Sequence, residues 1–91
     1  MKVKLNLFYP ALREFINSPA EIMVSGLTVG ECLRDFTRQF PGAERWIFDH
    51  RGQLVEQVVV FINAESSRRI TLSDPVREGD ELILAMLVIG G

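Results

Sequence analysis

The amino-acid sequence predicts an α+β fold in which one long helix packs on one face of a small sheet. Residues 2–8 alternate polar and apolar side chains, and residues 28–40 carry apolar side chains at helical spacing. Segments 57–63 and 81–89 are rich in aliphatic side chains. Alternation is typical of a strand with one buried face, and a period near 3.6 is typical of an amphipathic helix. Because strands stand before and after the helix, the helix is expected to cover one side of their sheet.

The first third of the chain predicts two strands with a short link. Val3, Leu5 and Leu7 share one side of the first strand, with polar residues between them. Pro10 ends this strand, and "ALREFINSP" predicts a helical turn closed by turn-forming residues. "AEIMV" at 20–24 predicts a second strand, the natural antiparallel partner of the first.

The main helix has the clearest start signal in the chain. Thr28 and Glu31 match a capping box, and Leu27 and Cys32 have the spacing of a hydrophobic staple. The Pro-Gly pair at 41–42 ends the helix. Its apolar face consists of Val29, Leu33, Phe36 and Phe40.

The second half predicts a short helix in "AERWIFD", an interior strand in "QVVVFIN", a short return strand in "RRITL", and a last strand over 81–89. We expect the apolar face of the main helix to meet one side of these strands in a single core. The expected strand partners are Val3, Leu5, Leu7, Val58, Val60, Ile62, Leu82 and Leu84.

Composition narrows the class of protein. Ninety-one residues predict one domain, 1–91, and 47% of them are apolar. The net charge of −2 and the scattered basic residues argue against a nucleic-acid partner. A single cysteine forms no internal disulfide and suits a reducing compartment. No stretch is apolar for long enough to span a membrane or to act as a signal peptide, so we expect a cytoplasmic protein.

The C-terminal segment "DELILAMLVIGG" is the unusual feature. Both faces of its strand are apolar, so the face not used by the core must pack against another part of the chain or against a partner. We expect an exposed apolar patch there, with Phe8 or Tyr9 on the neighbouring strand. Gly90 and Gly91 carry no side chains, so we expect residues 89–91 to form a flexible tail that can enter a narrow slot. The predicted contacts from the last strand are Ala85, Leu87 and Ile89.

Several motifs together resemble one family, the MoaD/ThiS ubiquitin-like sulfur carriers. They are "LRE" at 12–14, "TVGECLRDF…FPG" at 28–42, "VFIN" at 60–63 and "LSDPVREGDELIL…VIGG" at 72–91. They occur in the family's order and span its length. The resemblance implies a β-grasp fold with a mixed four- to five-stranded sheet and one main helix.

The family's chemistry falls on the last two residues. The resemblance implies that an ATP-dependent, ubiquitin-activating-type adenylyltransferase adenylates the Gly91 carboxylate, and that sulfur then displaces AMP to leave a thiocarboxylate. Gly90 is implied to keep the tail slim. The chain itself is then no enzyme and binds no cofactor or metal. The implied acceptor is a molybdopterin synthase large subunit or a cysteine synthase, and the pathway stays open because Met86-Leu87 stand where molybdopterin-type carriers often have Pro-Pro.

Two rival functions are weighed against the carrier. A protein modifier would join Gly91 to target lysines, and a plain binding module would make no use of the glycines. Other reactive residues favour structural roles. Cys32 fits a core position better than a sulfur relay, and His50 has no companion ligands for a metal. The resemblance implies that Asp80 and Glu81 lie at a turn leading into the last strand, which argues against an acid–base pair.

Overall fold

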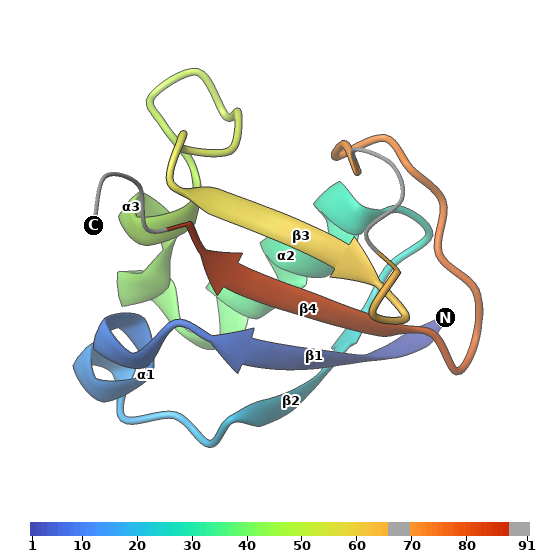
Figure 1. The fold of residues 1–91 in the computed structure, drawn as a ribbon, viewed down its shortest axis with the longest axis horizontal. Helices are drawn as coiled ribbons and strands as arrows, with labels where there is room; N and C mark the ends of the chain where they lie inside the picture. The colour runs from blue at the N-terminus through green and yellow to red at the C-terminus, as the bar shows by residue number, and fades with distance from the viewer. Residues whose placement is uncertain (66–69, 88–91) are drawn as a thin grey trace.

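The structure, a computed structural model, describes residues 1–65 and 70–87 and contains a four-stranded sheet with the long helix α2 across one face (Figure 1). Shorter helices lie at the end of the sheet where β1 and β4 finish. The elements are β1 (Lys2–Phe8), α1 (Pro10–Ile16), β2 (Glu21–Ser25), α2 (Val29–Gln39), the 3₁₀ turn η1 (Pro41–Ala43), α3 (Glu44–Ile47), β3 (Val58–Ile62) and β4 (Glu81–Met86).

The strand order is β2-β1-β4-β3, so β1 and β4 occupy the centre of the sheet. β1 and β4 run parallel, whereas β1–β2 and β3–β4 are antiparallel pairs. The parallel register places Leu5 opposite Leu82 and Leu7 opposite Leu84. The predicted α+β class and mixed sheet are confirmed.

The predicted core is also confirmed. The inward side chains of all four strands meet the apolar face of α2, and Phe36 is fully buried between them. Phe40 and Ile62 are only partly buried and pack at the margin of this cluster. The other predicted members are all buried: Val3, Leu5, Leu7, Val29, Leu33, Val58, Val60, Leu82 and Leu84.

The start of α2 is as predicted, but the hydrophobic staple is wrong. The Thr28 hydroxyl accepts a hydrogen bond from the Glu31 amide at 3.1 Å. The Glu31 carboxylate accepts from the Leu27 amide at 2.9 Å, one residue before the usual capping-box donor. The Leu27 carbonyl also accepts from the Val76 amide at 3.0 Å. With its backbone held in this way, the Leu27 side chain is 59% exposed, whereas Cys32 is buried.

Two predictions about the second half are corrected. β3 is an edge strand, not an interior one. Its run of apolar residues has a different cause, because Val58 and Val60 enter the core while Val59 and Phe61 lie half-buried on the other face of the sheet. The expected return strand is absent at residues 70–72, where the described part of "RRITL" lies.

The turn after β3 explains how the chain reverses there. Asn63 and Ala64 both have left-handed backbone conformations, with φ of 55° and 59°. Two such residues in succession are typical of a type I′ turn. The Glu65 amide donates to the Ile62 carbonyl across this turn at 3.1 Å.

β4 ends sooner than the predicted strand 81–89. Its last residue is Met86, and the Leu87 amide donates to the Gln57 carbonyl at 2.6 Å. Ile89, Gly90 and Gly91 lie outside the described residues.

Candidate functional site

The predicted site begins where the chain leaves β4. We call Met86 and Leu87 the tail root, because the last four residues follow directly. Met86 is the last residue of the central strand β4 and Leu87 follows it. This end of β4 lies at the same end of the molecule as α1 and α3 (Figure 1). Large apolar side chains are exposed at this end, with Phe8 62% and Leu87 44% exposed.

Pairing between strands gathers apolar side chains on the sheet face opposite α2. Phe8 stands opposite Ala85, and Ala85 stands opposite Val59 on the third strand. One pair further along, Ile83 stands opposite Phe61. We call this group the outer patch: Phe8, Val59, Phe61, Ile83, Ala85 and Leu87. All are half-buried or exposed.

Phe8 and Tyr9, which the sequence offered as alternatives for the exposed patch, have different environments in the structure. Phe8 belongs to the outer patch, whereas Tyr9 is only 7% exposed and packs edge-on against Trp46, with ring centroids 5.8 Å apart. Ala85 is half-buried. Val59, Phe61 and Ile83 were not among the site residues predicted from the sequence. Once the strand register is known, their alternate spacing places them on the same face as Ala85.

The far end of the sheet is finished by polar side chains. The Asn63 side-chain amide donates to the Asp80 carboxylate at 3.0 Å, and its carbonyl oxygen accepts from the Glu81 amide at 2.9 Å. Asp80 also accepts from the Arg77 amide at 2.8 Å. Because the Asp80 carboxylate is already used by this turn, it has a structural role.

The remaining reactive residues do not form a catalytic group. Cys32 is buried, and its burial raises the pKa of the thiol, so the unreactive protonated form is favoured. His50 is exposed in a loop. Among residues 1–65 and 70–87, no three metal-binding side chains lie together. No helix in this part of the chain has the length and apolar character needed to cross a membrane.

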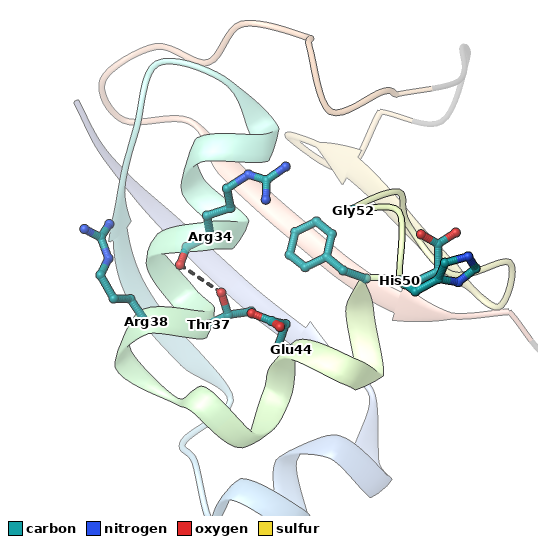
Figure 2. Close-up of a pocket in the computed structure, with 8 residues that line it drawn as sticks. Arg34, Thr37, Arg38, Glu44, His50 and Gly52 are labelled. Atoms are coloured by element: carbon teal, nitrogen blue, oxygen red, sulfur yellow. Dashed lines mark hydrogen bonds between the residues drawn. The ribbon is translucent and has the colours of Figure 1, made fainter.

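A hollow of about 550 Å³ lies on the helical side of the molecule, away from the outer patch (Figure 2). The Arg34 guanidinium stacks over the Phe48 ring at 5.2 Å. The Thr37 hydroxyl donates to the Arg34 carbonyl at 2.9 Å, so it is not free as a nucleophile. Arg38 points away from the hollow, toward an ion pair with Asp35. This surface offers an arginine stacked on an aromatic ring, beside the polar side chains of Glu44, Asp49 and His50.

Comparison with protein-family models and with curated proteins finds no match. Solved structures do match. SAMP1 from Haloferax volcanii is 29% identical, with 100% of both chains covered and a TM-score of 0.84. The Amycolatopsis orientalis BexX/CysO complex contains a chain that is 24% identical, covering 98% of this chain and 99% of that one, with a TM-score of 0.80. In the Helicobacter pylori complex of molybdopterin-converting factor subunits 1 and 2, the match is 21% identical over 100% of both chains, with a TM-score of 0.61.

This fold and these matches define a ubiquitin-like β-grasp protein. More particularly, its structural matches make the chain similar to the MoaD/ThiS family, with SAMP1 29% identical over the whole chain. Proteins of this family are small sulfur carriers or protein modifiers and are not themselves catalysts.

Proposed function

We propose that this protein is a cytoplasmic sulfur carrier whose reactive group is the Gly91 carboxylate. A carboxylate oxygen attacks the α-phosphate of ATP, forms an acyl-adenylate and releases pyrophosphate. Hydrosulfide then attacks the acyl carbon and AMP leaves, so that sulfur replaces one carboxylate oxygen. If a protein persulfide supplies the sulfur, a thiol must then cleave the acyl disulfide, which leaves the thiocarboxylate and a new disulfide.

The observation that carries this proposal is the tail root. A central strand ends among exposed apolar side chains, and a segment ending in two glycines follows it. Two reactive side chains considered from the sequence have structural roles, since Cys32 is buried and Asp80 is engaged in a turn. A partner that binds the outer patch would receive the C-terminus within reach of its own active site.

In this proposal residues 1–91 form one domain, and residues 89–91 serve as its tail. Gly90 keeps the tail slim enough for a narrow slot. The outer patch, with Ile89 beyond it, contacts a ubiquitin-activating-type adenylyltransferase and then the acceptor. The acceptor is a molybdopterin synthase large subunit or a cysteine synthase. ATP is used by the activating enzyme, and the carrier itself holds no cofactor.

The test is to incubate the protein with the ubiquitin-activating-type enzyme of its source organism, ATP and sulfide. The intact protein should gain the mass difference between sulfur and oxygen, located on its C-terminal peptide. Removal of Gly91, or addition of one residue after it, should abolish the gain and leave the fold unchanged. Gly90→Val should impair it, because a β-branched side chain obstructs a slot shaped for backbone. Equal sulfuration of the protein lacking Gly91 would refute the proposal.

The buried cysteine makes a second readout available. Burial raises the pKa of the Cys32 thiol and shields its sulfur, so iodoacetamide should react slowly with the folded protein. A thiocarboxylate on Gly91 should be alkylated rapidly after the sulfuration reaction. The Cys32→Ser variant is the matched control and should be labelled just as rapidly.

A protein modifier is the second candidate. It is favoured by the 29% identity to SAMP1 from Haloferax volcanii. The SAMP1 structure from Methanosarcina acetivorans, which is 28% identical, is described as small archaeal modifier protein 1. In this case the adenylated Gly91 would form isopeptide bonds with lysines of target proteins. Lys2 and Lys4 are the only lysines of the chain. Lys4 forms an ion pair with Glu21 at 3.6 Å. Lysine-linked conjugates in the same reaction, with a target extract added, would identify the modifier.

A further inference from the structure

The length of the C-terminal segment limits how far a partner's active site can lie from the domain. Gly91 is the fourth residue after Leu87, and an extended chain advances roughly 3.3 Å per residue, so the tail reaches at most about 13 Å. An enzyme that acts on Gly91 must therefore cover the surface around the tail root. This inference rests on the proposed function. The surface around the tail root includes both faces of the sheet.

The side of the tail root opposite the outer patch has a groove of about 390 Å³. Met86 alternates with Leu87 and so points to the α2 side of the sheet, but it lies beyond the core and is exposed. It lines the groove together with Tyr9, Arg45, Trp46, Val55 and Gln57. We call this hollow the Trp46 groove.

Aromatic rings fix the shape of this surface. The Phe15 ring packs against Trp46 with centroids 5.3 Å apart, and Trp46 in turn packs against Tyr9. A Cβ atom at Gly42 would lie 3.2 Å from the Phe15 ring, so the ring packs closely over this glycine. Phe15 is nevertheless 59% exposed. An exposed ring that is already held in place loses little entropy on binding, which suits an interface anchor.

A positive charge lies at the edge of the same groove. Arg45 is exposed, and within residues 1–65 and 70–87 it forms no ion pair. Arginine beside tryptophan and methionine is a combination enriched in protein interfaces. Charge complementarity then calls for an acidic side chain on the partner.

We propose that the Trp46 groove, with Phe15 at its rim, is a second docking surface for the activating enzyme. The enzyme contributes an apolar segment that packs on Trp46 and Phe15, and an acidic side chain that pairs with Arg45. The enzyme thus contacts the tail root on both faces of the sheet, through the outer patch on one face and the Trp46 groove on the other.

The test measures the Michaelis constant for the carrier in ATP–pyrophosphate exchange by the activating enzyme. Phe15→Ser and Arg45→Glu should each raise KM by about tenfold or more, as expected for interface anchors, with kcat unchanged. Arg51→Glu is the matched control, because Arg51 is an exposed arginine on a loop outside the groove, and its KM should not change. Thermal unfolding of each variant checks that the fold is intact.

A direct readout uses the fact that the chain has a single tryptophan. Protein labelled with 5-fluorotryptophan gives one ¹⁹F resonance, from Trp46, which should shift or broaden when unlabelled enzyme is added. The same effect should be lost with Arg45→Glu.

The outcomes separate the two proposals. If the wild-type protein is not adenylated at all, the proposed function fails and this inference falls with it. If the wild type is adenylated and both groove variants keep its KM, the enzyme uses only the outer patch and the inference alone is wrong. If deletion of residues 88–91 shifts the Trp46 resonance without enzyme, the groove holds the protein's own tail, which also overturns it.

Discussion

At the end of the sheet where β4 begins, polar side chains close the turns, whereas at the end where β4 finishes, large apolar side chains face solvent. Asn63 and Asp80 satisfy each other and the neighbouring backbone amides at the first end. Phe8, Phe15 and Leu87 have no comparable cover at the second. Met1 and Leu27 are also exposed near the first end, but there hydrogen bonds within the chain close the turn before β4, whereas the second end has the composition of a surface completed by a partner.

The largest expected effect concerns the core that separates the two ends. Phe36 is fully buried, and Phe36→Ala should lower the free energy of unfolding by about 3–5 kcal/mol, because it leaves a cavity. Urea denaturation measures this change. Met23→Ala, at an exposed position on β2, should change it by no more than about 0.5 kcal/mol. Similar losses for the two variants would mean that the assigned core is wrong.

The next effect tests the open end. Leu87→Asp should lower kcat/KM for adenylation by roughly tenfold or more, since it puts a charge into an apolar contact. The melting temperature should stay nearly constant because Leu87 is half exposed. Met23→Asp places the same charge on the same face but far from the tail root, and it should leave adenylation unchanged. A large fall in melting temperature for Leu87→Asp would instead assign Leu87 to the core.

The closed end should show the opposite behaviour. Asn63→Ala removes two hydrogen bonds to the start of β4 and should cost about 1–2 kcal/mol of stability without affecting adenylation. Asn17→Ala is the matched control. Asn17 also has a left-handed backbone, with φ of 53°. Asn17→Ala therefore removes the same preference of asparagine for this backbone conformation as Asn63→Ala does. Equal losses in denaturant titrations would show that the Asn63 side-chain bonds add nothing.

The smallest effect refines the turn itself. Ala64 has a φ of 59°, a conformation that disfavours a side chain. Ala64→Gly should therefore stabilise the protein by about 0.5–1 kcal/mol. Gly79→Ala should act in the reverse direction, because Gly79 has a φ of 87°. A loss of stability with Ala64→Gly would mean that the turn is not strained.

Sequence patterns predicted the elements whose signals are local. The alternation in β1 and the capping residue Thr28 located a strand and the start of α2 to within about one residue. The position of β3 at the edge was not predicted, because Val59 and Phe61 imitate a strand buried on both faces. The exposure of Leu27 was missed because its backbone is held by Val76, a residue distant in sequence.

Part of the candidate site was also predictable from local patterns, and part was not. Phe8, Ala85 and Leu87 followed from the period of two along their strands. The Trp46 groove did not, because α1, α3 and β4 meet only in the folded molecule. No spacing along the chain relates Phe15 to Trp46. A surface assembled from four separate segments needs the tertiary structure before it can be recognised.

The parallel pairing of β1 with β4 has a mechanical consequence. Because the two strands run in the same direction, the start of β1 and the end of β4 lie at opposite ends of their shared ladder. A force that pulls on the C-terminus while the N-terminus is held would load all the hydrogen bonds of that ladder in shear at once, rather than opening them one after another. If a partner draws the C-terminus into a slot, as proposed, the parallel ladder would resist that pull by loading its hydrogen bonds together.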